Sequence, residues 1–578
     1  MAESRASDDP GSCGLLEGWA GRAQWRVLAA RFGSGLPFLR AWQAWKDDPD
    51  RPRILHFVSA APQPPAAGEI TRAASPYPAL EALACELSLQ WFGFTRGTHR
   101  LSFEGGRVLL TLHVRDVTDV LRIEPFTVDS VLLAGGEDAQ VIKSLARHCT
   151  RGTRIGGFAS ADTRGALAQA GFELQSVTGG VPTTGLKGVF NPRWQPKGSR
   201  TAHLGDAREP RDAVVIGAGL AGAAATAALA RRGWRVTVLD GATQSASGAS
   251  GLPVGLLAPH YSPDDNLLSR LSRAGVRMTM AEADALLRAG ADWSATGALE
   301  HRVGDAAVMP AADDAQRPWS EPASAEQIAR AGLDAGTSAL WHERAAWIKP
   351  AALVHAWLAS ERVTWRGGVT VGGLRRREDG AAWEVHDADG QTVASATLIV
   401  VAAALASAAL LNGRLALHPV RGQISWAEQP AGLDAPPFAV NGHGHFIPHV
   451  PYGDAMAWFS GSTYGRGDMA CDPRVADTQA NHERLKTLLP RLASQLDASF
   501  AAGGVQAWSN VRCASTDRRP IVGEIERGLW VSTAMGSRGL TFCTLAAELI
   551  AARLHDEPLP IEHRLAQALD AARALQPR

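Results

Sequence analysis

The sequence is short of cysteine pairs, of excess charge and of long apolar runs, and each shortage excludes a class of protein. Its six cysteines form no C-x-x-C pair, which argues against a disulfide framework or a cysteine metal site and favours reduced thiols. Lys+Arg and Asp+Glu both total 58, so net charge does not favour non-specific nucleic-acid binding. No apolar run approaches the roughly 20 residues that span a bilayer, and the polar N-terminus lacks a signal pattern. We therefore expect a cytoplasmic protein without a membrane segment.

The length of the chain, 578 residues, exceeds what one hydrophobic core organises. Strand and helix patterns alternate from residue 25 to 190, which is typical of a parallel α/β domain. Residues 191–210 are rich in proline, glycine and charge, as linkers are. We expect a loose tail over 1–24, a first domain over 25–190, a linker over 191–210 and a second domain over 211–578.

The second domain opens on its most informative stretch, AVVIGAGLAGAAATAALARRGWRVTVLD, which runs from Ala213 to Asp240. An apolar strand leads into Gly217, Gly219 and Gly222 in G-x-G-x-x-G spacing, an alanine-rich helix follows, and a second strand ends in the acid. The three glycines respectively permit a tight turn, a close approach to a pyrophosphate, and close packing of helix on strand. The helix N-terminus suits phosphates and the carboxylate suits ribose hydroxyls. The stretch predicts a dinucleotide site, with NAD and FAD both open.

A histidine cluster, His443, His445 and His449 in NGHGHFIPH, has spacing that suggests either a metal site or a loop over an active site. Because no acid or cysteine lies beside it, we favour the loop and expect no metal.

Further motifs in the second domain resemble the D-amino-acid oxidase/glycine oxidase superfamily of FAD enzymes. They are GASG at 248–251, PVRGQIS at 419–425, GSTY at 461–464, RCASTDRRPIVG at 512–523 and GSRGL at 536–540. The resemblance implies an FAD-binding Rossmann-type domain with a substrate-binding β-sheet subdomain. In the first domain, RFGSGLPFLRAWQAW, ILHFVS, EGGRVLLTLHVRDV and RGTRIGGFASADTRGALAQAGFEL are similar to the Rossmann-like methyltransferase half of bifunctional tRNA-modifying enzymes.

In that bifunctional family, the C-terminal domain uses FAD to oxidise the carboxymethylaminomethyl group of the wobble uridine of tRNA and releases glyoxylate. The N-terminal domain then methylates the freed aminomethyl group from S-adenosylmethionine. The resemblance implies FAD as cofactor and tRNA as partner. Two alternatives stay open, namely an oxidase of free D-amino acids, glycine or sarcosine with an unrelated fused domain, and a non-enzymatic scaffold.

The resemblance also implies roles for particular residues. Arg512 is expected to bind the substrate carboxylate through its planar, bidentate guanidinium, with Arg421 as runner-up. The superfamily often has Ala-x-Gly after its late apolar strand, whereas Ala402, Ala403 and Ala404 stand here. Beside the fingerprint Gly217, Gly219, Gly222 and Asp240, the implied cofactor contacts are Ser250, Gly251, Gly536, Ser537, Arg538 and Gly539.

The first domain departs from the resemblance at three acidic positions. Ala29 stands where the family has an acid at the end of the first strand, and Ala60 ends the second strand. Ala134 begins Ala-Gly-Gly where the family has Asp-Gly-Phe-Ala-Pro, while Asp116 is retained. An amine without a nearby hydrogen-bond acceptor cannot be aligned for methyl transfer. We hypothesise that this domain is a degenerate methyltransferase fold, and S-adenosylmethionine binding stays open.

Overall fold

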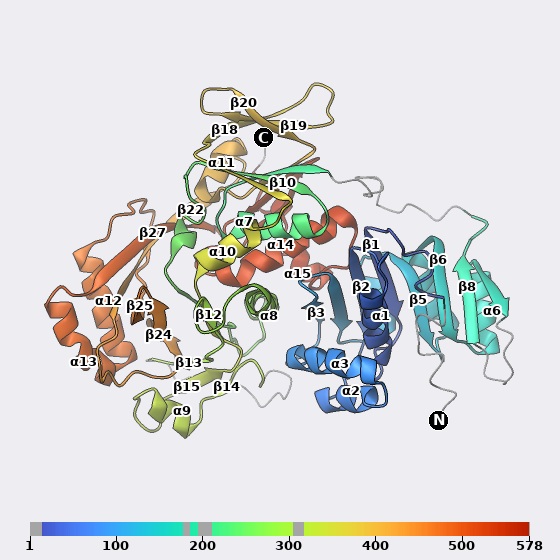
Figure 1. Cartoon of the computed structure of the whole chain (residues 1–578), viewed down its shortest axis with the longest axis horizontal. Helices are drawn as coiled ribbons and strands as arrows, with labels where there is room; N and C mark the ends of the chain where they lie inside the picture. The colour runs from blue at the N-terminus through green and yellow to red at the C-terminus, as the bar shows by residue number, and fades with distance from the viewer. Residues whose placement is uncertain (1–13, 177–184, 195–210, 304–316, 577–578) are drawn as a thin grey trace. The chain divides into compact units, whose positions relative to one another are not determined.

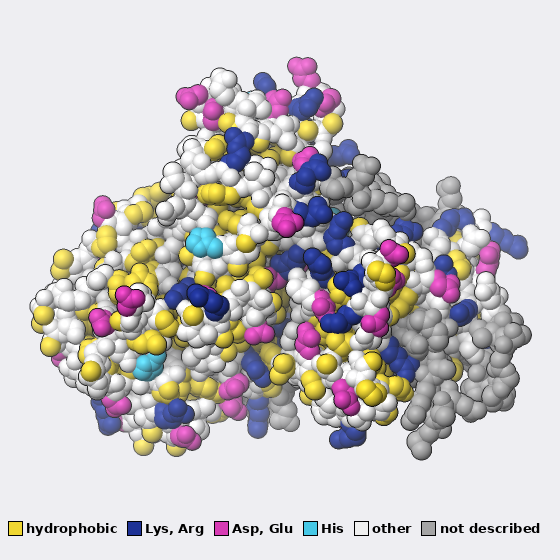
Figure 2. Space-filling model, in the orientation of Figure 1, with side chains coloured by type: hydrophobic (Ala, Val, Ile, Leu, Met, Phe, Trp, Pro, Cys, Tyr) yellow, Lys and Arg dark blue, Asp and Glu magenta, His cyan; other side chains and the backbone are white. Residues whose placement is uncertain are grey.

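The computed structural model describes residues 14–176, 185–194, 211–303 and 317–576. By its internal contacts the chain divides into two compact units. Within the described ranges, no helix is long and apolar enough to cross a membrane. Figure 2 shows Lys/Arg and Asp/Glu side chains spread over the visible face. Unit 1 consists of residues 1–210, 231–233 and 551–567, and unit 2 of residues 211–230, 234–550 and 568–578.

Unit 1 is built on an eight-stranded sheet in the order β3-β4-β2-β1-β5-β6-β8-β7. Its strands are β1 Gln24–Ala29, β2 Ile54–Ala60, β3 Thr98–Phe103, β4 Val108–His113, β5 Val128–Ala134, β6 Cys149–Phe158, β7 Phe172–Ser176 and β8 Gly185–Phe190. Its helices are α1 Leu36–Asp47, α2 Ala67–Ala74, α3 Pro78–Gln90, α4 Val117–Ile123, α5 Ala139–Leu145, α6 Ala161–Gln169 and α15 His563–Gln567.

The sheet of unit 1 is mixed, whereas the alternating pattern predicts a parallel one. The five strands β4, β2, β1, β5 and β6 are parallel and Rossmann-like in order, but β3, β8 and β7 pair antiparallel at the two edges. The expected tail is also wrong in its second half, because Leu15 and Trp19 are buried in the core. The indole of Trp25 donates to the Leu15 carbonyl at 3.1 Å. The linker from residue 195 onwards lies outside the described residues.

A buried ion pair inside unit 1 joins segments that lie far apart in the sequence. Nε and Nη2 of Arg232 each donate to Glu557 at 2.6 Å, and the two side chains are only 3% and 1% exposed. His56, on β2, lies 3.7 Å from the same carboxylate. Burial alone would raise the pKa of Glu557, but Arg232 and His56 hold it well below its usual value. The core of unit 1 therefore includes residues from the late part of the chain.

Unit 2 contains a six-stranded sheet in the order β17-β10-β9-β21-β29-β28 and a nine-stranded sheet. The strands of the first are β9 Asp212–Ile216, β10 Arg235–Asp240, β17 Val363–Gly367, β21 Leu398–Val401, β28 Ile521–Glu526 and β29 Leu529–Thr533. The strands of the second are β13 Ala298–His301, β14 Glu321–Pro322, β15 Ala339–His342, β22 Leu417–Glu428, β23 Ala439–Gly442, β24 Gly444–Tyr452, β25 Ala455–Gly461, β26 Gly465–Arg466 and β27 Gln506–Ser515.

Two three-stranded sheets and several helices complete unit 2. The small sheets comprise β11 Gly255–Leu257, β12 Trp293–Ser294 and β16 Ala346–Ile348, and β18 Val371–Arg376, β19 Trp383–Asp387 and β20 Thr392–Ala396. The helices are α7 Leu220–Arg231, α8 Leu267–Leu286, α9 Ala325–Arg330, α10 Pro350–Leu358, α11 Ser407–Leu410, α12 Val475–Leu488, α13 Pro490–Ala501 and α14 Gly539–His555, whose last residues count with unit 1. The structure thus has both architectures that the resemblance implies, a Rossmann-type sheet and a separate larger β-sheet.

The expected strand, helix and strand of the glycine stretch are present as β9, α7 and β10. α7 has helical composition in sequence and is buried nearly all round. All four pairings from β17 to β29 are parallel, and β28 closes the edge antiparallel. The carboxyl ends of the parallel strands therefore meet along one edge of the sheet.

Two buried histidines make unit 1 sensitive to acid. Burial lowers the pKa of His56, and burial together with Arg115 lowers the pKa of His113 to about 3. The His113 ring is therefore neutral in the folded state at mildly acidic pH and gains a proton on unfolding below the ordinary pKa of about 6.5. The free energy of unfolding should therefore fall with falling pH below about 6.5, and His113 should contribute about 1.4 kcal/mol per pH unit to this slope.

Urea unfolding of the full chain at pH 7.5, 6.5 and 5.5, followed by tryptophan fluorescence, measures this slope. The matched variant His113→Asn should reduce the slope below pH 6.5 by one histidine's share, whatever it does to stability at pH 7.5. An unchanged slope in that variant would contradict the assignment.

Candidate active site

A cavity of about 1030 Å³ opens in unit 2 where the parallel strands of the six-stranded sheet end. It is lined by Gly217 after β9, Asp240 at the end of β10, Ala402 after β21 and Ala534 after β29. In open α/β sheets, ligands bind outside the carboxyl ends of the strands. The cavity therefore lies where the glycine stretch predicts a dinucleotide.

The glycine turn packs so tightly that side chains are excluded from it. Gly217 has φ of 104°, and a Cβ there would lie 2.5 Å from the carbonyl oxygen of Ala402. A Cβ on Gly222 would overlap the carbonyl oxygen of Gly217 itself. These are the tight turn and the close helix–strand packing that the spacing predicts. Gly219 lines the cavity, and its Cβ would meet only the Ser250 hydroxyl, at 2.9 Å.

Two polar side chains brace this turn from neighbouring segments. Asp240 accepts hydrogen bonds from the backbone N–H of Ala218 at 2.7 Å and of Ala242 at 2.8 Å. Ser250 accepts from the N–H of Leu220 at 2.9 Å, at the first turn of α7. A carboxylate has about four lone-pair sites, so Asp240 retains acceptor capacity for ribose hydroxyls. Gly251 does not line the cavity; its N–H closes a turn to Gly248 and a Cβ would lie 2.7 Å from the Ala246 carbonyl oxygen.

A second helix begins at the same cavity. Gly536, Ser537, Arg538 and Gly539 all line it, and α14 starts at the last of them. A Cβ on Gly539 would lie 3.2 Å from the Leu220 side chain at the start of α7. The positive ends of two helix dipoles therefore face one cavity, which favours an anionic ligand.

The alanine that replaces the superfamily's glycine keeps a glycine-like backbone. Ala404 has φ of 49°, in the left-handed region, and lines the cavity. Its carbonyl oxygen accepts from the Thr533 hydroxyl at 3.2 Å. A non-glycine residue in this region costs on the order of 1 kcal/mol. The turn after β21 therefore keeps its left-handed backbone although alanine replaces glycine, and this conformation lowers the stability of the fold slightly.

The opposite wall of the cavity is one transverse row of the nine-stranded sheet. Glu300 on β13 pairs with Asn441 on β23, which pairs with His445 on β24. The row continues through Gly461 and Ile424 to Trp508 on β27. Five of these six residues line the cavity, with Gly461 the exception and its neighbour Ser462 lining it instead. Strand pairing, rather than proximity in sequence, brings them together.

Arg512 lies on β27 four residues after Trp508 and lines the same cavity. Its Nη2 donates to the Thr463 carbonyl at 2.9 Å, and its guanidinium carbon lies 4.3 Å from the centroid of the Tyr464 ring. A Cβ on Gly422 would overlap that Nη2 and lie 2.6 Å from the guanidinium carbon. The glycine of PVRGQIS therefore makes room for the arginine of RCAST. A guanidinium has five N–H donors, so donors remain for a carboxylate.

The charges around the cavity favour an anionic ligand as well. Burial lowers the pKa of Arg512 and of Arg538, although a guanidinium stays charged at neutral pH. Burial and the nearby Arg512 lower the pKa of His445 to about 4, so its imidazole is neutral. Burial alone would raise the pKa of Glu300, but the hydrogen bond from His342 at 2.9 Å brings it below its usual value.

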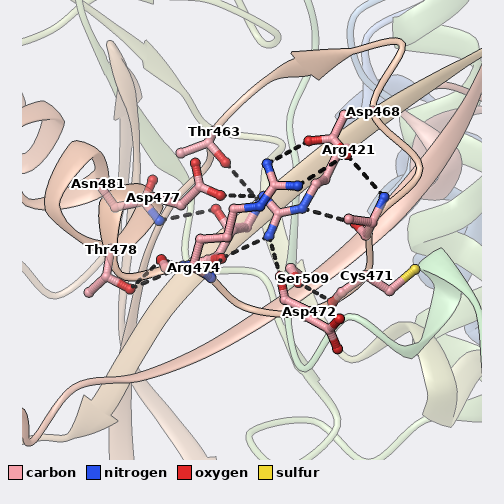
Figure 3. Close-up of polar contacts among 12 residues, drawn as sticks. Arg421, Thr463, Asp468, Cys471, Asp472, Arg474, Asp477, Thr478, Asn481 and Ser509 are labelled. Carbon is pink, nitrogen blue, oxygen red and sulfur yellow. Dashed lines mark hydrogen bonds and ion pairs between the residues drawn. The ribbon is translucent and has the colours of Figure 1, made fainter.

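Arg421, the runner-up for the carboxylate, is wrong for that role. It does not line the cavity and is 2% exposed. Figure 3 shows its guanidinium surrounded by acceptors: Nε donates to the Ala470 carbonyl at 2.9 Å, Nη2 to the Asp472 carbonyl at 2.6 Å, and Nη1 pairs with Asp477. It anchors the segment between β25 and α12.

The histidine cluster is a hairpin rather than a loop. His443 lies in the turn between β23 and β24, and His445 on β24 lines the cavity. His449 contacts the side chain of Gln429 at 3.0 Å.

Sequence reasoning missed several residues of the cavity wall. Glu300 and Asn441 have no local motif, and Tyr464 is the last residue of GSTY, a motif in which no residue was given a role. For two further missed residues, Trp508 and Asn510, a signal was available, because they alternate with Arg512 along β27 and therefore share its face.

Residues 212–553 match the family of FAD dependent oxidoreductases. Glycine oxidase from Geobacillus kaustophilus has a similar structure, with a TM-score of 0.50 and 20% identity over 61% of this chain and 97% of that one. The chain is therefore an oxidoreductase of the FAD-dependent class, with the fold that its sequence motifs imply.

Relatives that match nearly the whole chain define the family more narrowly. The tRNA 5-methylaminomethyl-2-thiouridine biosynthesis bifunctional protein MnmC of Polaromonas naphthalenivorans (strain CJ2) is 48% identical, over 98% of this chain and 93% of its own length. The protein of the same name from Polaromonas sp. (strain JS666 / ATCC BAA-500) is 49% identical, over 96% and 92%. The chain belongs to this MnmC family.

The closeness of α7 to the glycine turn generates a sharp prediction. In Gly222→Ala the new Cβ must displace the Gly217 carbonyl, which is backbone, so we expect about 3 kcal/mol of destabilisation of unit 2 and loss of flavin from the purified protein. Flavin absorbance per protein and thermal unfolding measure the two effects. The control Gly373→Ala, on β18, places a Cβ with nothing within 4 Å and should leave both unchanged. Full flavin occupancy in Gly222→Ala would contradict the packing argument.

Proposed function

We propose that this protein oxidises the carboxymethylaminomethyl group of 5-carboxymethylaminomethyl-(2-thio)uridine at the tRNA wobble position to the aminomethyl form. The observation that carries the proposal is a single cavity lined both by a dinucleotide turn and by Arg512. The names of the relatives that match nearly the whole chain support tRNA as the substrate. We place the reaction in the cytoplasm, where the free cysteines of the described chain stay reduced.

FAD fits the residues of the cavity. The fingerprint glycines exclude any Cβ from the turn, and two helix N-termini offer N–H groups for a pyrophosphate. The turn through Gly219 and the start of α7 would hold the phosphates, Asp240 the ribose, and the 536–539 turn the far end of the cofactor. Bound FAD supplies a two-electron acceptor, which no side chain can provide.

The protein side chains bind and orient the substrate arm. Arg512 holds its carboxylate, which places the methylene carbon between carboxylate and nitrogen at a defined distance from the wall. That carbon loses a hydride and the nitrogen a proton, water adds to the resulting C=N bond, and the C–N bond breaks to release glyoxylate and the aminomethyl base. Neutral His445 beside Arg512 adds no second positive charge, so the substrate amine is not repelled.

We propose that unit 1 no longer carries out the methylation that the word bifunctional implies for the relatives. The strands β2, β1 and β5 are neighbours, and Ala60, Ala29 and Ala134 stand at their carboxyl ends. The one acid nearby that sequence reasoning missed, Glu137, is buried and accepts from the N–H of Ala134 at 3.0 Å and of Gly135 at 3.1 Å. It closes the shortened loop from within, which supports a structural role for that carboxylate.

The oxidation is tested with purified holoenzyme and bulk tRNA that carries the carboxymethylaminomethyl base. Glyoxylate and the aminomethyl nucleoside should form, and Arg512→Lys should lower kcat/KM by roughly 10- to 100-fold, because one bidentate charged contact is lost. The exposed control Arg375→Lys should not. Oxidation of free glycine or sarcosine with tRNA untouched would favour the small-amine oxidase instead. In a strain that lacks the gene, the carboxymethylaminomethyl base should accumulate at the wobble position.

Titration calorimetry tests whether unit 1 binds S-adenosylmethionine. We expect no saturable binding of S-adenosylmethionine to the full chain, and no methyl transfer to tRNA that carries the aminomethyl base, because the acids that grip the ligand are absent. Micromolar affinity together with methyl transfer would refute the degenerate-domain hypothesis.

A further inference from the structure

The segment from Thr463 to Arg474 is held rigidly at the edge of the cavity. Arg421 holds this segment through the bonds described above, and Gln423 holds it as well. The side chain of Gln423 accepts from the Arg474 N–H at 2.7 Å and donates to the Arg474 carbonyl at 2.8 Å. The Thr463 hydroxyl accepts from the Gln423 N–H at 3.1 Å. The segment therefore leaves and re-enters the fold at positions set by β22 (Figure 3).

Tyr464 follows Thr463 at the start of this segment and is a large side chain of the cavity wall that remains exposed to solvent. It is 55% exposed, although it lines the cavity. Its ring contacts the Arg512 guanidinium, whose carbon lies 4.3 Å from the ring centroid. One side of the ring is thus engaged, and the rest is open to solvent. Aromatic rings are usually buried for their large apolar area, so a rigidly held, half-exposed ring beside a ligand-binding arginine suggests contact with the ligand.

The proposed substrate has a planar ring at the right distance from Arg512. Between C5 of the uracil and the carboxylate carbon lie four bonds, about 5 Å when extended. A uracil whose carboxylate is bound by Arg512 therefore lies within reach of a ring centred 4.3 Å from that guanidinium. Proteins bind single-stranded RNA bases by stacking them on aromatic side chains. A free amino acid has no ring to stack.

We propose that Tyr464 is the stacking platform for the wobble uracil and so a specificity-determining residue that favours a nucleoside over free small amines. The proposal rests on the function proposed above. Tyr464 recognises the base, Arg512 the carboxylate, and the Arg421-anchored segment sets the distance between them.

The experiment separates the base from the carboxylate. The holoenzymes of Tyr464→Phe and Tyr464→Leu are compared with wild type in kcat/KM for the modified tRNA. Their Kd for acetate is measured by perturbation of the flavin absorption band, because acetate occupies Arg512 and has no ring. Phe should stay within about 3-fold of wild type for tRNA, since it keeps the ring. Leu should lower kcat/KM by roughly 10- to 100-fold, with the acetate Kd changed by less than about 3-fold.

Met469→Ala serves as the matched control, since this residue lies on the same segment, is 59% exposed and does not line the cavity. It should leave kcat/KM unchanged. An equal loss of tRNA activity and acetate affinity in Tyr464→Leu would show that Tyr464 only positions Arg512. No loss of either would show that Tyr464 has no role in substrate binding. Each of these results would overturn the inference. If wild type itself binds acetate but leaves tRNA untouched, the proposed function fails instead.

Discussion

The close approach of α7 to β9, with no side chain between Gly222 and the Gly217 carbonyl, is the contact on which unit 2 depends. It brings the first turn of a helix to the end of the strand that has β10 on one side and β21 on the other. A methyl group at this point would move the helix away from the sheet edge where the carboxyl ends of the strands meet. Asp240, Ala402 and the start of α14 then surround the place where the helix points.

Electrostatics determines which ligands this cavity attracts. The dipoles of α7 and α14 and two partly buried arginines, Arg512 and Arg538, make one cavity attractive to anions, although the chain has no net charge. The dinucleotide phosphates and the substrate carboxylate are both anionic, so the same positive potential attracts both ligands. His445 is neutral and adds no charge to the cavity, and the negative charge of Glu300 is paired with His342. The positive potential of the two arginines therefore remains. Charge alone does not distinguish a nucleoside from a free amino acid, and we propose that the ring of Tyr464 makes this distinction.

Arg421 and Arg512 show why the site could be predicted only in part. Both follow from motifs, and both stand on strands that pair with each other, β22 and β27. Along β22 the side chains alternate: Gly422 and Ile424 line the cavity, whereas Arg421 and Gln423 face the anchored segment. A sequence displays this alternation but not which of the two faces meets the ligand. The wrong runner-up has this cause, whereas Tyr464 was missed because it lies between β25 and β26, outside any strand pattern.

Local pattern by itself determined the β9–α7–β10 unit, its glycine spacing and its terminal acid, because these depend on neighbours within a few residues along the chain. The strand-end losses at Ala29, Ala60 and Ala134 were equally plain in sequence. Only the tertiary structure decided that Glu300, Asn441 and His445 form one wall and that Arg232 and Glu557 meet in the core of unit 1. Those arrangements depend on strand register and on packing between distant segments, and no spacing within the chain encodes them.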